Sequence, residues 1–89
     1  MYDIVVISGG FDPVHKGHVR MIQSAAKAGE LLVVGVNSDE WLRRKKGKEF
    51  MSFDERVEIM SAFSGVGYAV GFDDSDNSAC ELIKTAREL

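Results

Sequence analysis

Apolar residues gather in three short runs along the chain, each followed at once by a polar residue. The runs occupy residues 4–7, 31–36 and 68–72. A short continuous apolar run is typical of a strand that is buried on both faces, as the strands of parallel sheets are. The pattern therefore predicts three strands in a parallel sheet.

The segments between these runs carry apolar residues at helical spacing. Residues 18–28 predict a long helix, and a short helix is expected through Trp41 and Leu42. Two later segments show the capping-box pattern, a serine followed three residues later by a glutamate, which opens a helix. These pairs are Ser52 with Glu55 and Ser78 with Glu81.

Alternation of strands and helices predicts right-handed crossovers between parallel strands. The fold class expected for residues 1–89 is a single α/β domain with a doubly wound, Rossmann-like sheet. In the common strand order 3-2-1-4-5 the first strand is central, so three strands leave one of its edges open. We expect either a chain that continues past Leu89, which makes the domain incomplete at its C-terminus, or pairing of this strand in a homodimer.

Composition and charge narrow the function classes. Hydrophobic residues make up 45% and charged residues 28% of the sequence, as in ordinary globular proteins, which argues against disorder and against a membrane protein. The formal net charge of -3 disfavours broad nucleic-acid binding, so an anionic substrate needs a local positive site. Cys80 is the only cysteine, which excludes an intrachain disulfide and predicts a buried, inert thiol in a reducing, cytoplasmic compartment. No apolar run is long enough for a membrane span.

Residues 9–18 form a glycine-rich segment between the first strand and the first helix. Proteins of this class bind ligands there, at the carboxyl ends of the strands. Gly9, Gly10 and Gly17 allow a bound group to approach the backbone closely, and the free N-H groups of the first helical turn suit a phosphate oxygen. The segment predicts an anion-binding site.

His15 and His18 lie on either side of Gly17 in this segment and are the only two histidines of the chain. A tight turn can direct both imidazoles toward one phosphate. An imidazole N-H lowers the barrier of a phosphoryl reaction when it faces the charge that builds up on the phosphate oxygens. The pair is therefore predicted to be catalytic.

The segment resembles the G-x-F-D-x-x-H-x-G-H signature of the cytidylyltransferase-like nucleotidyltransferases, with every fixed position present in residues 9–18. The resemblance continues through residues 36–39, through the basic stretch 43–48 and through Glu55 with Arg56. The chain is most similar to the small glycerol-phosphate and sugar-phosphate members of this family.

This resemblance implies an enzyme that transfers CMP, or less favourably AMP, from a nucleoside triphosphate to glycerol 3-phosphate or a sugar phosphate and releases pyrophosphate. His15 and His18 would stabilise the α-phosphate. Gly9, Gly10, Phe11 and Gly17 would bind the nucleotide. Mg²⁺ would arrive with the triphosphate, because it keeps most of its waters and needs few protein ligands.

Asp12 would either fix the loop or orient a phosphate-bound cation, and a simple turn residue is the alternative interpretation. Within the basic stretch Lys46 is the first candidate for phosphate neutralisation and Lys45 the second, in a segment expected to be mobile around Gly47. Arg56 and Asp39 are further candidates for the substrate phosphate. Arg56 could instead brace the lysine segment, or it could be a helix-surface arginine beside Glu55, with the glutamate serving as a cap.

Three aspartates, Asp73, Asp74 and Asp76, suggest a metal loop, but the glycine and the terminal glutamate of a calcium loop are missing at the required spacing. Turn and cap chemistry is predicted instead, and no metal-ligand set is expected. The serine- and threonine-rich signature with an arginine that family members carry later in the chain is also absent. The alternative function is therefore a non-catalytic nucleotide-binding or assembly module.

Overall fold

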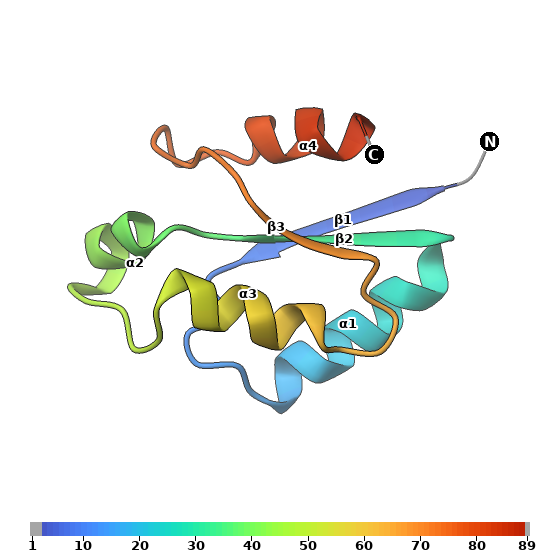
Figure 1. Ribbon diagram of the computed structural model, residues 1–89, viewed down its shortest axis with the longest axis horizontal. Helices are drawn as coiled ribbons and strands as arrows, with labels where there is room; N and C mark the ends of the chain where they lie inside the picture. Colours follow the sequence, from blue (N-terminus) through green and yellow to red (C-terminus); the bar gives the residue numbers. More distant parts are fainter. Residues whose placement is uncertain (1–2, 89) are drawn as a thin grey trace.

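Three parallel strands form one open sheet, in the order β1-β2-β3 with β2 in the centre (Figure 1). The computed structural model describes residues 3–88. Along the chain the elements are β1 (Ile4–Gly9), α1 (Lys16–Ala28), β2 (Leu31–Val36), α2 (Asp39–Lys46), α3 (Phe53–Ser61), β3 (Tyr68–Gly71) and α4 (Cys80–Arg87). This arrangement confirms the predicted α/β class with a parallel, Rossmann-like sheet.

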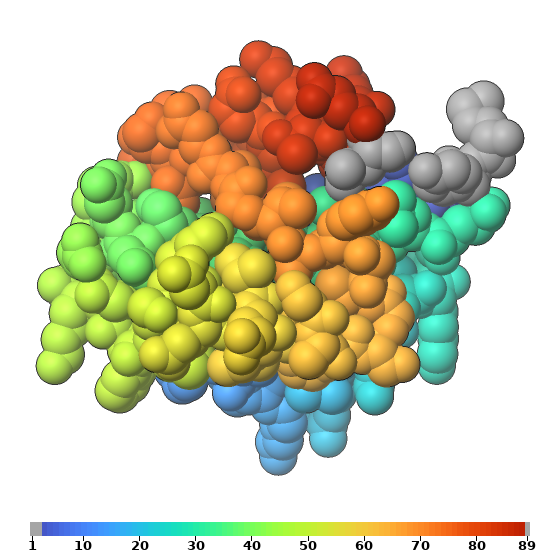
Figure 2. Space-filling view, in the orientation of Figure 1, coloured from blue at the N-terminus to red at the C-terminus, as the bar shows by residue number. Residues whose placement is uncertain are grey.

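Helices cover both faces of the sheet: α1 and α3 lie on one face and α4 on the other (Figure 1). In the space-filling view α4, in red, forms one outer layer, and α3, in yellow, belongs to the opposite layer (Figure 2). Side chains of a strand alternate between the two faces, so β2 supplies both cores. Val34 packs toward α1 and α3, whereas Val33 packs toward α4, and both are fully buried. Burial on both faces explains why this strand is continuously apolar.

Gly35, in the middle of β2, allows α4 to lie directly on the sheet. A Cβ atom at this position would overlap the side chain of Leu82, which is itself fully buried. We predict that Gly35→Ala lowers the free energy of unfolding by about 1–3 kcal/mol through overpacking. Urea denaturation measures this loss. In a Leu82→Ala background the added methyl group gains room, so the penalty should shrink, and an undiminished penalty would contradict the packing argument.

One of the two predicted capping boxes is absent from the structure. α3 begins as predicted, with Ser52 Oγ accepting from Glu55 N at 3.4 Å. α4 begins one residue later than predicted, with Ala79 at the N-cap, and has no side-chain cap. The Ser78 oxygen, which lies before the N-cap, accepts from Cys80 N at 3.4 Å, and its hydroxyl donates to Asp76 at 2.9 Å. The predicted capping box at Ser78 is therefore wrong.

Cys80 is exposed at the start of α4, so the expected buried thiol is wrong as well. The helix turns its apolar face, with Leu82 and Ala86, toward the sheet and leaves its first residue in solvent.

β1 lies at the edge of the sheet, as the strand order 3-2-1-4-5 predicts when only the first three strands are present. Within the described residues it pairs with β2 from Ile4 opposite Leu31 to Gly9 opposite Val36. No helix between residues 3 and 88 is long and apolar enough to cross a membrane.

Candidate active site

The loop after β1 and helix α2 together line an open cleft of about 500 Å³ at the carboxyl ends of β1 and β2. Two segments that are some thirty residues apart in the sequence meet there. The lining residues are Gly10, Phe11, Asp12, Pro13, His15, His18, Trp41, Leu42, Lys45 and Lys46. The sequence predicted most of this set, namely the histidine pair, the lysine pair and much of the glycine-rich loop.

His15 and His18 form a reciprocal cap at the start of α1. Gly17 N donates to Nδ1 of His15 at 3.1 Å, and His15 N donates to Nδ1 of His18 at 3.1 Å. The two rings stack with their centroids 4.0 Å apart. A Cβ atom on Gly17 would lie 2.8 Å from the His15 ring, so the glycine makes room for this imidazole. Helix capping therefore fixes both rings before any ligand binds.

The same hydrogen bonds decide which ring nitrogens carry protons. A nitrogen that accepts a hydrogen bond carries no proton, and a neutral imidazole then has its N-H on the other nitrogen. Because Nδ1 is the acceptor in both rings, Nε2 is the donor in both. The pair thus provides two N-H donors on one side of the cleft, which is what an anionic oxygen requires.

Burial, assisted by the positive charge that His15 would carry, lowers the pKa of His18 below its ordinary value of 6.5. The ring of Phe11, itself buried, meets His18 edge-on at a centroid distance of 5.1 Å. His18 is therefore held neutral at pH 7, and the neutral form is the one that its cap requires.

The lowered pKa of His18 predicts a pH dependence of stability. Between the lowered pKa and 6.5 the unfolded chain binds a proton that the folded chain does not, so stability rises with pH there. The contribution of neutral His18 is complete above pH 6.5 and is lost as the pH falls through the folded pKa. We expect urea denaturation from pH 7.5 to 5 to show a smaller decline for His18→Gln than for the natural chain. An equal decline in both would contradict this assignment.

Asp12 joins the histidine loop to the segment after α2. Its carboxylate accepts from Phe50 N at 2.6 Å and from Met51 N at 2.7 Å. Burial alone would raise the pKa of Asp12, but these two hydrogen bonds and the contact with Lys46 outweigh burial and lower it. Of the roles considered for Asp12, fixing the loop is the one that these contacts support.

Lys46 and Lys45 are the two members of the basic stretch that line the cleft. Lys46 Nζ donates to Asp12 O at 2.6 Å and lies 2.9 Å from the Asp12 carboxylate, whereas Lys45 Nζ lies 5.4 Å from the centre of the Trp41 ring. Both belong to α2, which ends at Gly47 with a φ of 93°. The stretch predicted as a mobile segment is thus helical as far as Lys46.

The arginines of this stretch contact the protein instead. Arg43 makes a bidentate ion pair with Glu49, at 2.7 and 3.0 Å. Arg44 donates to Asp74 O at 3.0 Å and to Asn77 Oδ1 at 3.3 Å.

Arg56 is buried and braces the loops around the cleft. Its guanidinium donates to the main-chain oxygens of Met51, Gly10 and Asn37 at 3.1, 2.9 and 2.6 Å, and to the Asp39 carboxylate at 2.6 Å. The side chain has no exposed surface. The surface arginine considered for this position is therefore wrong, and of the other two roles the geometry favours bracing. Asp39 is the ion-pair partner of Arg56.

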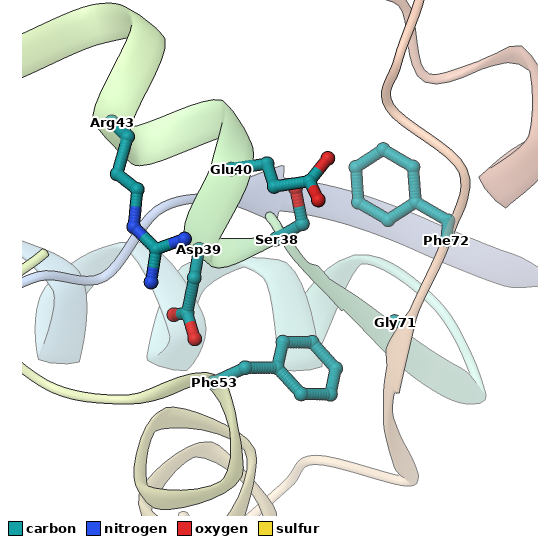
Figure 3. Close-up of a pocket in the computed structure, with 7 residues that line it drawn as sticks. All are labelled: Ser38, Asp39, Glu40, Arg43, Phe53, Gly71 and Phe72. Carbon is teal, nitrogen blue, oxygen red and sulfur yellow. The ribbon is translucent and has the colours of Figure 1, made fainter.

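A second hollow, of about 400 Å³, lies on the other side of α2 (Figure 3). The rings of Phe53 and Phe72 stand on two of its sides, and Asp39, Glu40 and Arg43 reach toward it from α2. Asp39 and Arg43 are already paired with Arg56 and Glu49. These pairs leave the hollow less suited to an anion than the histidine cleft.

Two of the three aspartates after β3 make the predicted turn contacts. Asp73 Oδ1 accepts from the N-H and hydroxyl of Ser75, and Asp76 Oδ1 accepts from those of Ser78. Among residues 3–88 no three or more histidine, cysteine, aspartate or glutamate side chains are grouped closely enough to hold a metal ion. Asp74 differs from its neighbours because it is buried and bonds to the end of β2, a contact that no local sequence pattern indicates.

The family model described as "Cytidylyltransferase-like" matches residues 6–87, and the match includes the histidine loop, α2 and Arg56. The chain belongs to the cytidylyltransferase-like family of nucleotidyltransferases. This membership confirms the resemblance inferred from residues 9–18.

Curated relatives are longer proteins. The chain is 43% identical over 86 residues to the bifunctional protein HldE of Syntrophotalea carbinolica and 40% identical to that of Geobacter sulfurreducens, with 94% of this chain and 17% of each relative covered. It therefore spans about a sixth of the length of these relatives. A crystal structure of the lipopolysaccharide core biosynthesis protein from Thermoplasma volcanium matches 99% of this chain and 68% of its own, with a TM-score of 0.82 and 26% identity.

Proposed function

We propose that this protein transfers a nucleotidyl group from a nucleoside triphosphate to a sugar phosphate and releases pyrophosphate. The observation that carries the proposal is the pair of capped imidazoles, whose Nε2 donors share one cleft with Lys45 and Lys46. Four donors in a cleft of a weakly acidic protein provide the local positive site that a triphosphate needs.

In the proposed reaction a phosphate oxygen of the acceptor attacks the α-phosphorus of the triphosphate. The new phosphorus-oxygen bond forms as the bond to the β-phosphate oxygen breaks, and pyrophosphate leaves with that electron pair. Negative charge spreads over the α-phosphate oxygens in the transition state. The N-H groups of His15 and His18 would stabilise this charge, and Lys46 would leave Asp12 to neutralise the phosphates.

Mg²⁺ would be bound mainly by the triphosphate oxygens. The cleft supplies cations and N-H donors, and its one carboxylate, Asp12, is already engaged by Phe50, Met51 and Lys46. When bound, the ion would neutralise charge on the phosphates and orient them.

A sugar phosphate is the favoured acceptor over glycerol 3-phosphate, because the similar Thermoplasma protein is described as acting in lipopolysaccharide core biosynthesis, which is saccharide assembly. The donor is proposed to be CTP or ATP, in line with the cytidylyltransferase-like family. A direct comparison of the two donors decides the base.

Calorimetry of the chain with Mg²⁺ and CTP, and then with Mg²⁺ and ATP, tests the first half of the proposal. We expect one nucleotide to bind at micromolar concentrations and the other much more weakly. Pyrophosphate release in the presence of a panel of sugar phosphates tests the second half. Binding without release would favour the non-catalytic nucleotide-binding module, and absence of binding by either nucleotide would contradict both functions.

A further inference from the structure

Asp74, in the segment after β3, places a buried carboxylate against the start of α2. The residue is only 4% exposed, although it lies in a loop with exposed aspartates on both sides. Its carboxylate accepts three hydrogen bonds, from Asn37 Nδ2 at 3.0 Å, from Ser38 N at 2.8 Å and from Ser38 Oγ at 2.8 Å. Removing a carboxylate from water is unfavourable unless hydrogen bonds replace those to water. Here all three replacements come from the two residues between β2 and α2, Asn37 and Ser38.

Ser38 links the Asp74 carboxylate to helix α2. As the N-cap of α2, its Oγ accepts from Trp41 N at 3.0 Å while its proton goes to Asp74. The Asp74 carboxylate thus orients the hydroxyl that caps the helix, and its charge lies at the positive end of the helix dipole. Arg44, six residues after Ser38 in α2, donates to Asp74 O at 3.0 Å. Helix α2 is therefore bonded to the loop after β3 at two points, at its N-cap Ser38 and at Arg44.

Asn37 connects the same carboxylate to the histidine loop. Its N donates to Gly9 O at 3.0 Å, its O accepts from Arg56 at 2.6 Å, and its side chain donates to Asp74. Arg56 in turn binds Gly10 O at 2.9 Å. A continuous set of hydrogen bonds therefore runs from Asp74 through one residue to the loop that carries His15 and His18.

We propose that Asp74 is a positioning residue, which fixes the start of α2 so that Lys45 and Lys46 face the two histidines. Asp74 itself does not line the cleft, so it would not touch a nucleotide bound there. This inference rests on the proposed function for its effect on nucleotide binding, but its effect on α2 can be measured without any nucleotide.

Asp74→Asn is the test variant and Asp73→Asn its matched control. Both replacements remove one negative charge from the same loop, but the Asp73 carboxylate bonds only to Ser75 within its own turn. An asparagine at position 74 keeps the size of the side chain but removes its charge. If its oxygen keeps the bonds from Asn37 Nδ2 and Ser38 N, its amide nitrogen faces Ser38 Oγ, so the hydroxyl can no longer donate to position 74 and the charge-assisted bond that orients the cap is lost.

Trp41 reports the position of α2 directly, because it is the only tryptophan of the chain and its main-chain N-H donates to the capping oxygen of Ser38. Acrylamide quenching of its fluorescence is measured on the natural chain and both variants, at a temperature at which circular dichroism shows all three folded. We expect the quenching constant of Asp74→Asn to rise toward that of the urea-unfolded chain, and that of Asp73→Asn to stay at the natural value. Affinity for the better of Mg-CTP and Mg-ATP should fall about tenfold in Asp74→Asn alone, as the loss of a charge-assisted hydrogen bond implies.

Unchanged quenching in Asp74→Asn would overturn the inference, and so would increased quenching with unchanged nucleotide affinity. If the natural chain binds neither nucleotide, the proposed function fails, and the quenching comparison still decides whether Asp74 fixes α2. Should Asp74→Asn not fold, Ser38→Ala removes the hydroxyl through which Asp74 acts and carries the same two expectations.

Discussion

Replacing His18 with alanine is expected to lower kcat for pyrophosphate release by about 10²–10³-fold, the usual loss when one preorganised donor to a developing oxyanion is removed. The reason lies in the tautomer: the cap bond from His15 N to His18 Nδ1 leaves the proton on Nε2, where it can face the α-phosphate. KM should change less than kcat, because the donor matters most when charge builds up. Steady-state kinetics with the better nucleotide and the best sugar phosphate measures both constants.

His18→Gln separates catalysis from folding. Glutamine at the third position of a helix can still accept from the N-cap N-H, so the capping box survives while the imidazole is lost. We expect its kcat to fall as in His18→Ala, whereas its free energy of unfolding should stay closer to that of the natural chain than that of the alanine variant does. If the kcat of His18→Gln equalled that of the natural chain, the imidazole N-H would not act in the transition state.

The features that can be inferred from the sequence are those that depend on neighbouring residues. The strands are visible because β2 is buried on both faces, which makes residues 31–36 continuously apolar. The histidine pair is visible because His15 and His18 cap the same helix and therefore lie within one turn of each other in sequence. Contacts of this kind leave a pattern in a short window of sequence.

The contacts that the sequence did not reveal join residues that are distant in the chain. Arg56 bonds to Gly10 across 46 positions, and Asp74 bonds to Asn37 across 37. The local sequence around Arg56 is like that of a surface arginine, and the local sequence around Asp74 is like that of a turn aspartate. Neither the burial of these two side chains nor their bonding partners could therefore be predicted. The Ser78 cap failed for a local reason, because α4 begins one residue later, with Ala79 at the N-cap, and the Ser78 oxygen accepts from Cys80 N instead of Glu81 N.

The two buried charges have related roles around the cleft. Arg56 supplies donors to carbonyl groups at the ends of β1 and β2, and Asp74 supplies acceptors for the N-H and hydroxyl groups that follow β2. Loops at the end of a parallel sheet expose main-chain groups that no neighbouring strand satisfies. In this protein two side chains satisfy them, and the ligand-facing histidines and lysines can then occupy the surface of the same loops.

Replacing Arg56 with methionine should therefore lower the free energy of unfolding by about 3–5 kcal/mol, which is typical for removal of one partner of a buried ion pair. Three main-chain oxygens, those of Met51, Gly10 and Asn37, would lose their donor together with the Asp39 carboxylate. Such a loss approaches the whole stability of many small domains, about 5–15 kcal/mol, so a large unfolded fraction is expected at 37 °C.

Urea denaturation followed by circular dichroism measures this change, with Arg43→Met as the control. Arg43 also forms a bidentate pair with a carboxylate, but its side chain is 54% exposed, and water can replace the lost contacts. The Arg43→Met control should unfold at a urea concentration close to the midpoint of the natural chain. If both variants lost the same small amount of stability, the guanidinium of Arg56 would not hold the loops together. The order of the cleft would then have to come from Asp74 and from the side chains of Leu42 and Trp41, which lie against Gly10.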